Sequence, residues 1–290
     1  MYSGITRLFK NKPEIRFEYP VHETVKESIK RINGKIGVTK IPIHHYGKVR
    51  STDYVAKKSE MYLELGKKKV LENTDGKFYY ELGIQAQVLG KFEDAISAFT
   101  KAIEKNPQLI GAYINLGSIY CRQKKFTEAV EIMSKAEKID TNHSDLHNNL
   151  GIAYEKLEKR QEAFEEFRKA IALNPNNIEA MLNASRLLFE SGEHERVKTI
   201  LNRVLKLNPK EWHAYNILGV IHGLAGDLEE SAESFKKVIE IFPGNEDAIV
   251  NLGNTYIAMG KKKEAKETFE KLISFGYNEE EVRKKLEALK

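Results

Sequence analysis

The sequence predicts an all-α solenoid, a right-handed superhelix of six helix-turn-helix repeats. Three patterns predict it, because prolines, Leu-Gly pairs and pairs of a small and a large apolar residue all recur every 34 residues. A period of this length is typical of arrays in which each repeat is one helix pair that packs on its neighbours. We also expect a capping helix at the carboxyl end and a small α+β segment at the amino end.

The prolines and the Leu-Gly pairs mark the turns and the close contacts of each repeat. Proline cannot continue a helix, so it marks the turn between repeats. The prolines are Pro107, Pro175, Pro209 and Pro243, with Thr141 in the vacant place. Glycine inside a helix costs about 1 kcal/mol relative to alanine, so its recurrence indicates a close approach of the second helix. The Leu-Gly pairs begin at residues 82, 116, 150, 218 and 252, and Ala184-Ser185 replaces the pair in the fourth repeat.

The second helix of each repeat is marked by a small or β-branched residue followed four positions later by a large apolar one. The large residues are Phe99, Met133, Phe167, Leu201, Phe235 and Phe269. They are expected to fill the space between neighbouring helix pairs. The three patterns together place the repeats at 76–109, 110–143, 144–177, 178–211, 212–245 and 246–279.

The segment Tyr113-x2-Leu116-Gly117-x2-Tyr120, followed by Ala129-x3-Met133, resembles the tetratricopeptide repeat (TPR) family. The resemblance covers residues 76–279 and implies an array that binds other proteins. Residues 54–75 are expected to form a helix that caps the first repeat and connects it to residues 1–53. Residues 278–290 are expected to form the capping helix at the other end, because one narrow apolar stripe lies among polar residues there.

One stripe of the first helices repeats asparagine at the sixth position of a repeat. Asparagine is a poor residue inside a helix, because its amide competes with the backbone for hydrogen bonds. Since a carboxamide both donates and accepts, such a row could hold the backbone of an extended peptide. The row resembles the asparagine ladder of O-linked N-acetylglucosamine transferases, which implies peptide binding in the concave groove. Alternatively, these are ordinary polar residues between adjacent helices. The candidate groove residues are Asn115, Asn149, Asn183, Asn216, Asn251, Arg122 and Arg186, and Ile217 interrupts the row.

Composition narrows the function further. With 41% hydrophobic and 31% charged residues the chain can bury a core, and it has no apolar run long enough for a transmembrane helix. A single cysteine, Cys121, excludes an internal disulfide, so a cytoplasmic protein is expected. His143 and His147 have the spacing of metal ligands on one helix face. Because His147 occupies a packing position, we expect neither a metal site nor a cofactor.

Residues 1–75 carry the basic excess, with 16 Lys and Arg against 9 Asp and Glu. Nucleic-acid binding is not favoured, because no aromatic-basic pattern accompanies the charge. The segments RLFKNKPEIRFEYPVHE (7–23) and IPIHHYGKV (41–49) resemble the carboxyl-terminal end of a family 2 (GT-A) glycosyltransferase that continues into TPRs. This resemblance implies that His22, Glu23 and His44 lie near the acceptor side of an active site.

The leading interpretation is a scaffold that binds an extended protein or peptide partner in the concave groove. The alternative is the carboxyl-terminal part of a split or truncated glycosyltransferase whose repeats present the acceptor protein. That enzyme family needs an Asp-x-Asp pair to hold its metal, and no two of the seven aspartates are two residues apart. We therefore do not expect this chain alone to be an enzyme. The sequence does not determine the oligomeric state.

Overall fold

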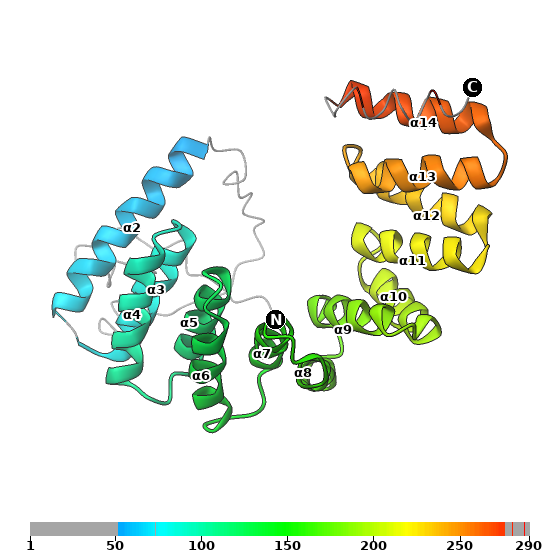
Figure 1. Cartoon of the computed structure of the whole chain (residues 1–290). Helices are drawn as coiled ribbons and strands as arrows, with labels where there is room; N and C mark the ends of the chain where they lie inside the picture. Colours follow the sequence, from blue (N-terminus) through cyan, green and yellow to red (C-terminus); the bar gives the residue numbers. More distant parts are fainter. Residues whose placement is uncertain (1–51, 73, 276–279, 281–286, 288–290) are drawn as a thin grey trace, which may run out of the picture. The chain divides into compact units, whose positions relative to one another are not determined.

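The computed structural model of the chain describes residues 52–72, 74–275, 280 and 287 (Figure 1). Every regular element within these residues is a helix, which confirms the predicted all-α fold. None of the helices in these ranges combines the length and the hydropathy that a bilayer-spanning segment requires. The short strands were expected in residues 1–53, and residues 1–51 lie outside the described residues. Residues 52 and 53 begin the first helix. Most of the capping helix expected at 278–290 lies outside them as well.

The helices divide into two compact units, residues 1–141 and 142–290. The first unit contains α2 (Thr52–Glu72), α3 (Gly76–Val88), α4 (Phe92–Lys105), α5 (Ile110–Arg122) and α6 (Phe126–Glu137). The second unit contains α7 (Ser144–Lys156), α8 (Arg160–Leu173), α9 (Ile178–Glu190), α10 (His194–Leu207), α11 (Trp212–Ala225), α12 (Leu228–Ile241), α13 (Glu246–Ala258) and α14 (Lys262–Ser274). From α3 onward the odd-numbered helices are the first helices of the repeats and the even-numbered helices are the second.

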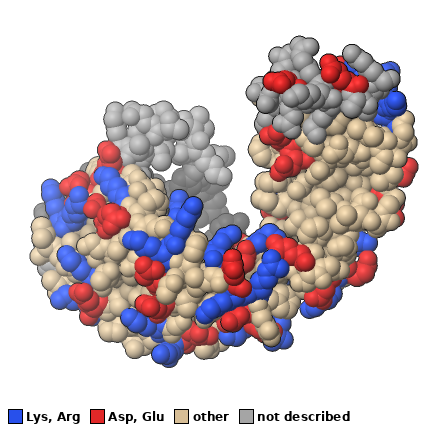
Figure 2. Space-filling model, in the orientation of Figure 1, with Lys and Arg blue, Asp and Glu red and all other residues tan. Residues whose placement is uncertain are grey.

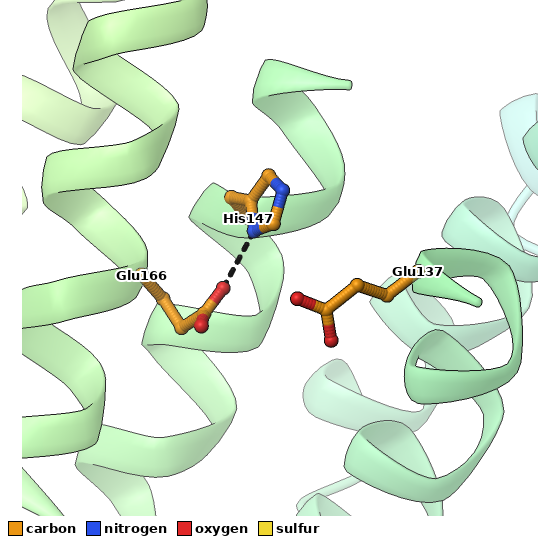
Figure 3. Close-up of side chains that lie close together, drawn as sticks. All are labelled: Glu137, His147 and Glu166. Carbon is orange, nitrogen blue, oxygen red and sulfur yellow. Dashed lines mark hydrogen bonds and ion pairs between the residues drawn. The ribbon is translucent and has the colours of Figure 1, made fainter. Parts of the chain in front are cut away.

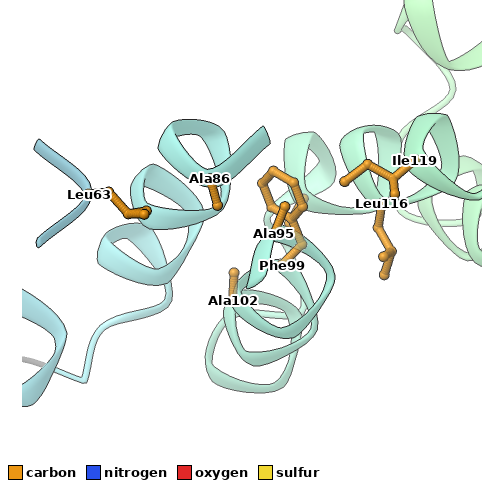
Figure 4. Close-up of a cluster of buried hydrophobic side chains, with 8 residues drawn as sticks. Leu63, Ala86, Ala95, Phe99, Ala102, Leu116 and Ile119 are labelled. Atoms are coloured by element: carbon orange, nitrogen blue, oxygen red, sulfur yellow. The ribbon is translucent and has the colours of Figure 1, made fainter. Parts of the chain in front are cut away.

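The core of the first unit joins α2 to the next three helices (Figure 4). Leu63 of α2 is buried in one cluster with Ala86 of α3, Phe99 of α4 and Leu116 of α5. The helix expected within residues 54–75 is therefore present as α2, and it packs directly against α3. Its burial protects an apolar face of the first helix pair that would otherwise meet water.

The two helices of each repeat touch through a glycine and a large side chain that lies sixteen residues later. A Cβ atom placed on Gly83 or Gly151 would lie 2.5 Å from the ring of Phe99 or Phe167. The same conflict recurs at Gly117, Gly219 and Gly253, where a Cβ atom would lie 2.5–2.8 Å from the facing side chain. Real Cβ atoms do not approach so closely, so these helices can pack only if one partner is glycine. The fourth repeat instead pairs Ser185 with the smaller Leu201, and both are fully buried.

The turn between the two helices of each repeat contains one residue with a left-handed backbone. These residues are Gly90, Lys124, Glu158, Gly192, Gly226 and Gly260, with φ between 61° and 85°. The following amide donates to the carbonyl five residues earlier, as in Lys125 N to Tyr120 O at 2.8 Å, which closes a Schellman-type turn. Four of the six positions are glycine because a left-handed backbone costs roughly 1–2 kcal/mol when a Cβ atom is present.

Three of the turns between repeats are closed by asparagine side chains. Asn106, Asn174 and Asn208 each precede a proline, and their side-chain oxygens accept hydrogen bonds of 3.1 Å from the amide two residues later. Asparagine also caps two of the first helices, with Asn177 at α9 and Asn245 at α13. These local bonds satisfy backbone groups that the helix ends leave without partners.

Replacing Gly151 with serine should lower the free energy of unfolding by about 1–3 kcal/mol, because the new side chain overlaps the ring of Phe167. The double variant Gly151→Ser, Phe167→Leu reproduces the Ser185–Leu201 combination of the fourth repeat and should recover part of the loss. Urea unfolding followed by circular dichroism measures both effects. A single variant as stable as the unmodified chain would contradict the steric explanation.

Replacing Glu158 with glycine should stabilise the chain by about 0.5–1 kcal/mol, because it removes the cost of a left-handed residue with a Cβ atom. The greater freedom of glycine in the unfolded chain offsets part of this gain. The reverse exchange, Gly192→Ala, tests the same turn one repeat later and should destabilise. Thermal unfolding curves of the two variants should therefore shift in opposite directions, and a shift in the same direction would argue against the backbone explanation.

Candidate functional site

The first helices of the second unit, α7, α9, α11 and α13, are here named the first-helix face. Besides packing on second helices, α7 contacts α9 directly and α11 contacts α13. Direct contact brings the stripes of these two pairs of repeats together. Asn183 on α9 and Asn251 on α13 therefore belong to helices that contact the preceding first helix.

Two of these asparagines make hydrogen bonds that join one repeat to the preceding one. The Asn183 Nδ2 atom donates to Oδ1 of Asn148 at 3.1 Å, which connects α9 to α7. In the first unit, Nδ2 of Asn115 lies 3.4 Å from the Tyr80 hydroxyl oxygen and donates to the Gly111 carbonyl at 2.8 Å. Both contacts between repeats span 35 residues, from the sixth position of one repeat to the fifth position of the repeat before it. These two carboxamides thus have a structural role.

The same geometry explains why Ile217 interrupts the asparagine row. The residue 35 positions before Ile217 is Leu182 of α9. Both side chains are half-buried and pack against one apolar cluster that includes Met181 and Leu218. An asparagine at position 217 would face an apolar neighbour and lose the acceptor that Asn148 offers to Asn183. In this repeat the apolar residue at the sixth position therefore matches the apolar neighbour on the preceding helix.

The other three carboxamides are not used within the described part of the chain. The side chains of Asn149 and Asn251 are half-buried and make no hydrogen bond to any described residue. The Oδ1 atom of Asn216 is buried and also has no partner among those residues. The half-buried side chains of Asn149 and Asn251 are partly open to a ligand, whereas the Oδ1 atom of Asn216 is closed off and leaves an unsatisfied acceptor, which costs free energy.

The two arginines predicted in the groove are both engaged by neighbouring side chains. The Arg186 guanidinium on α9 forms a bidentate ion pair with Glu155 on α7 and lies 3.7 Å from Glu190. Burial alone would raise the pKa of the Glu155 carboxyl, but the hydrogen bonds and charge of Arg186 hold this pKa below its ordinary value. Arg122 of the first unit places its guanidinium over the ring of Phe92, 4.8 Å from the ring centre.

The histidine considered as a metal ligand forms part of a buried polar contact. His147 on α7 lies in the packed interior, and its Nδ1 atom is 2.6 Å from Oε2 of Glu166 on α8 (Figure 3). Lys169 contacts the other carboxylate oxygen of Glu166 at 2.7 Å. Burial raises the pKa of the Glu166 carboxyl, but the bonds from His147 and Lys169 outweigh it and keep this pKa below the ordinary value. His143 precedes α7 and makes no side-chain hydrogen bond that caps the helix.

The remaining sequence candidates lie elsewhere. Burial raises the pKa of the Cys121 thiol to about 11, so the reactive thiolate is scarce at neutral pH. His22, Glu23 and His44 lie outside the described residues. The interpretation of residues 1–60 as the end of a glycosyltransferase therefore stays without structural support.

The first-helix face also lacks charge over α11 and α13, which sequence reasoning missed. No Lys, Arg, Asp or Glu occurs in the fourteen residues of α11, and α13 carries acids only at its first two positions. In Figure 2 the second unit accordingly shows a broad uncharged surface over these helices, whereas charges of both signs cover the first unit. Leu224 and Ile257 are exposed on them. The absence of charge from a largely polar chain was the signal that could have located this surface.

Replacing Arg186 with methionine should lower the free energy of unfolding by about 1–3 kcal/mol at pH 7, because it leaves the mostly buried Glu155 with only the longer contact to Lys156. Folding lowers the pKa of the Glu155 carboxyl, so its ionised form stabilises the chain at pH values above its pKa in the unfolded state, near 4.5. This stabilisation is lost as the pH falls through the pKa of the folded state. The difference between variant and unmodified chain should therefore shrink below about pH 4.5.

Urea unfolding at several pH values measures this difference. Arg160→Met is the matched control, since its pair with Glu190 is more exposed and should contribute less than about 1 kcal/mol. A difference that stays constant down to pH 3 would argue against a role for Glu155 ionisation.

Comparison with known families and structures agrees with this architecture. Three family models, each described as tetratricopeptide repeat, match residues 76–109, 108–176, and 156–218 with 224–289. All three matches begin at or after residue 76, so they give no support to the glycosyltransferase resemblance of residues 1–60. A comparison with curated protein sequences finds no match.

Solved structures of similar fold include a tetratricopeptide repeat protein from Parabacteroides merdae, which is 21% identical with a TM-score of 0.57. That match covers 82% of this chain and 94% of the other. YrrB, described as a TPR protein with an unusual peptide-binding site, is 25% identical with a TM-score of 0.53, covering 64% of this chain and 97% of its own. PilF from Pseudomonas aeruginosa is 16% identical with a TM-score of 0.65, covering 74% and 97%. The family matches and the repeated helix pair together show that this chain belongs to the tetratricopeptide repeat family.

Proposed function

We propose that this chain is a binding scaffold that holds an extended segment of a partner protein on its first-helix face. Membership of the tetratricopeptide repeat family indicates protein–protein interaction in general. The more specific proposal rests on one observation: Asn149, Asn216 and Asn251 present carboxamide groups that the described part of the chain leaves without hydrogen-bond partners.

The chemistry of these groups suits a peptide backbone. An extended chain offers one N–H donor and one carbonyl acceptor per residue, and a carboxamide can satisfy either. Hydrogen bonds to the backbone do not depend on the side chains of the partner. The three asparagines lie on α7, α11 and α13, so a partner that runs along the face would meet them in sequence.

The uncharged surface of α11 and α13 supports the same proposal. Since no charged side chain of α11 is present to select an oppositely charged ligand, affinity there must come from apolar contact and neutral hydrogen bonds. Exposed Leu224 and Ile257 supply apolar area on the helices that carry Asn216 and Asn251. Burying exposed apolar area contributes roughly 25 cal/mol per Å². A partner segment that alternates apolar side chains with accessible backbone fits this surface.

Asn115 and Asn183 differ from the other members of the row, because their amides already bind Gly111 and Asn148. The row is therefore a mixture of amides that hold neighbouring helices together and amides that are free to bind a partner. The two roles can be separated by experiment, because only the structural role affects stability in the absence of a partner.

Replacing Asn149 with alanine should leave the stability within about 0.5 kcal/mol of the unmodified chain and should weaken partner binding several-fold, because it removes one hydrogen bond worth about 1 kcal/mol. Replacing Asn183 should instead reduce stability, because buried Asn148 loses its donor. The full chain captures partners from cell extract, and calorimetric titration with the purified main partner then compares the variants.

Asn202→Ala is the control, since Asn202 is exposed on the second helix α10 and belongs to no first helix. Unchanged partner affinity in both Asn149→Ala and Asn251→Ala would show that the asparagine row does not bind the partner. It would leave a general role in protein interaction in place.

A further inference from the structure

One hollow of the second unit lies where the third and fourth repeats meet. A cavity of about 270 Å³ lies between α8, α9 and α10, within the second unit. Its walls are apolar, with Phe164, Met181, Leu188 and Ile200 contributed by all three helices. None of the groove asparagines contributes to its lining, so this cavity is separate from the surface proposed above for the partner backbone.

One position that carries a large side chain in the other repeats is small beside this cavity. Five of the six repeats place leucine at the seventh position, directly before the small residue of the helix seam. The fourth repeat has Ala184 there, and Ala184 lines the cavity. The alanine side chain has three fewer carbon atoms than that of leucine. Since exposed arginines also line the cavity, it is open to solvent, and a ligand that covers its apolar walls removes apolar surface from water.

Three arginines surround this apolar interior. Arg168 comes from α8, and Arg196 and Arg203 come from α10, with no acidic residue in the lining. Arg196 places its guanidinium over the Phe164 ring, 5.7 Å from the ring centre. Arg168 pairs with Glu165 and Arg196 with Glu193, each one turn away on the exposed surface. Arg203 makes no ion pair with any described residue and is exposed.

We propose that this cavity binds one large apolar side chain of a partner protein, presented by a segment with acidic residues on both sides. The size favours a side chain over a complete small-molecule ligand, since ligand pockets usually have about 300–1,000 Å³. A single buried anchor of this kind commonly dominates the affinity of a protein interface. The arginine rim is complementary to carboxylates, which it can bind through two parallel hydrogen bonds.

A methionine that lines the cavity makes the proposal testable by spectroscopy. The chain has five methionines, of which Met181 lines the cavity and Met133 is buried in the first unit as an internal reference. The full chain labelled with carbon-13 at the methionine methyl groups is titrated with the peptide EDFLDE at about 0.15 M salt, where long-range charge effects are screened. We expect a saturable shift of the Met181 methyl signal and no shift of the Met133 signal.

Two variants and one control define the site. Arg203→Glu should weaken binding at least tenfold, because it replaces an attraction by a repulsion at the rim. Ala184→Leu restores the leucine of the other repeats and should abolish the Met181 shift by filling the cavity. Lys210→Glu makes the same change of charge at an exposed residue outside the lining and should change affinity less than twofold. If Ala184→Leu fails to fold, the exposed Arg203→Glu variant still decides the question.

Three results would overturn the proposal. The first is that the Met181 signal shows no saturable shift up to millimolar peptide. The second is that Arg203→Glu binds EDFLDE as tightly as the unmodified chain, and the third is that the peptide EDSSDE, which lacks the apolar anchor, binds as tightly as EDFLDE. A Met181 shift caused by dodecanoate but not by EDFLDE would assign the cavity to free amphiphiles and would also reject a protein partner. Asn149→Ala should leave EDFLDE binding unchanged, so failure here and failure of the first-helix face are distinguishable.

Discussion

The close contact between the two helices of each repeat is the constraint on which the rest of the structure depends. In five repeats a glycine on the first helix lies so near a large side chain of the second helix that any Cβ atom would overlap it. The large side chain in turn is fully or almost fully buried, so it cannot move away without opening a void. Glycine and its partner are therefore one coupled unit, and their constant separation of sixteen residues keeps all helix pairs alike.

The fourth repeat shows the consequence of a change in this coupled unit. Serine replaces glycine at position 185, and Leu201 replaces the larger partner. The larger residue on the first helix is thus matched by a smaller one on the second helix, and both are buried. The adjacent Ala184 replaces the leucine of the other repeats, and it lines a cavity. All repeats of the chain share one packing scheme, so a residue that departs from it gives one repeat a surface that the others lack. We propose that the cavity beside Ala184 is such a surface and binds a partner.

Two contacts of the first helices depend on neighbours in space. Asn183 donates a hydrogen bond to Asn148 of the preceding repeat, and Ile217 packs with Leu182 against one apolar cluster. Asn149, Asn216 and Asn251 carry hydrogen-bonding groups that no described residue uses, and we assign these groups to a partner. A row that looks uniform in sequence thus contains two kinds of residue.

The sequence alone determined the repeat, its period and the helical class, because the seam residues and the prolines are local signals that recur in a fixed order. It also contained two signals that went unread: the glycines of the left-handed turns at the same period, and the absence of charge in α11. Only the tertiary structure decided which asparagines are engaged, that Arg186 binds Glu155, and that Ala184 borders a cavity. Each of these depends on side chains that are distant in the sequence and meet in space. A sequence period does not reveal whether two such side chains pack together, form a hydrogen bond or leave a space between them.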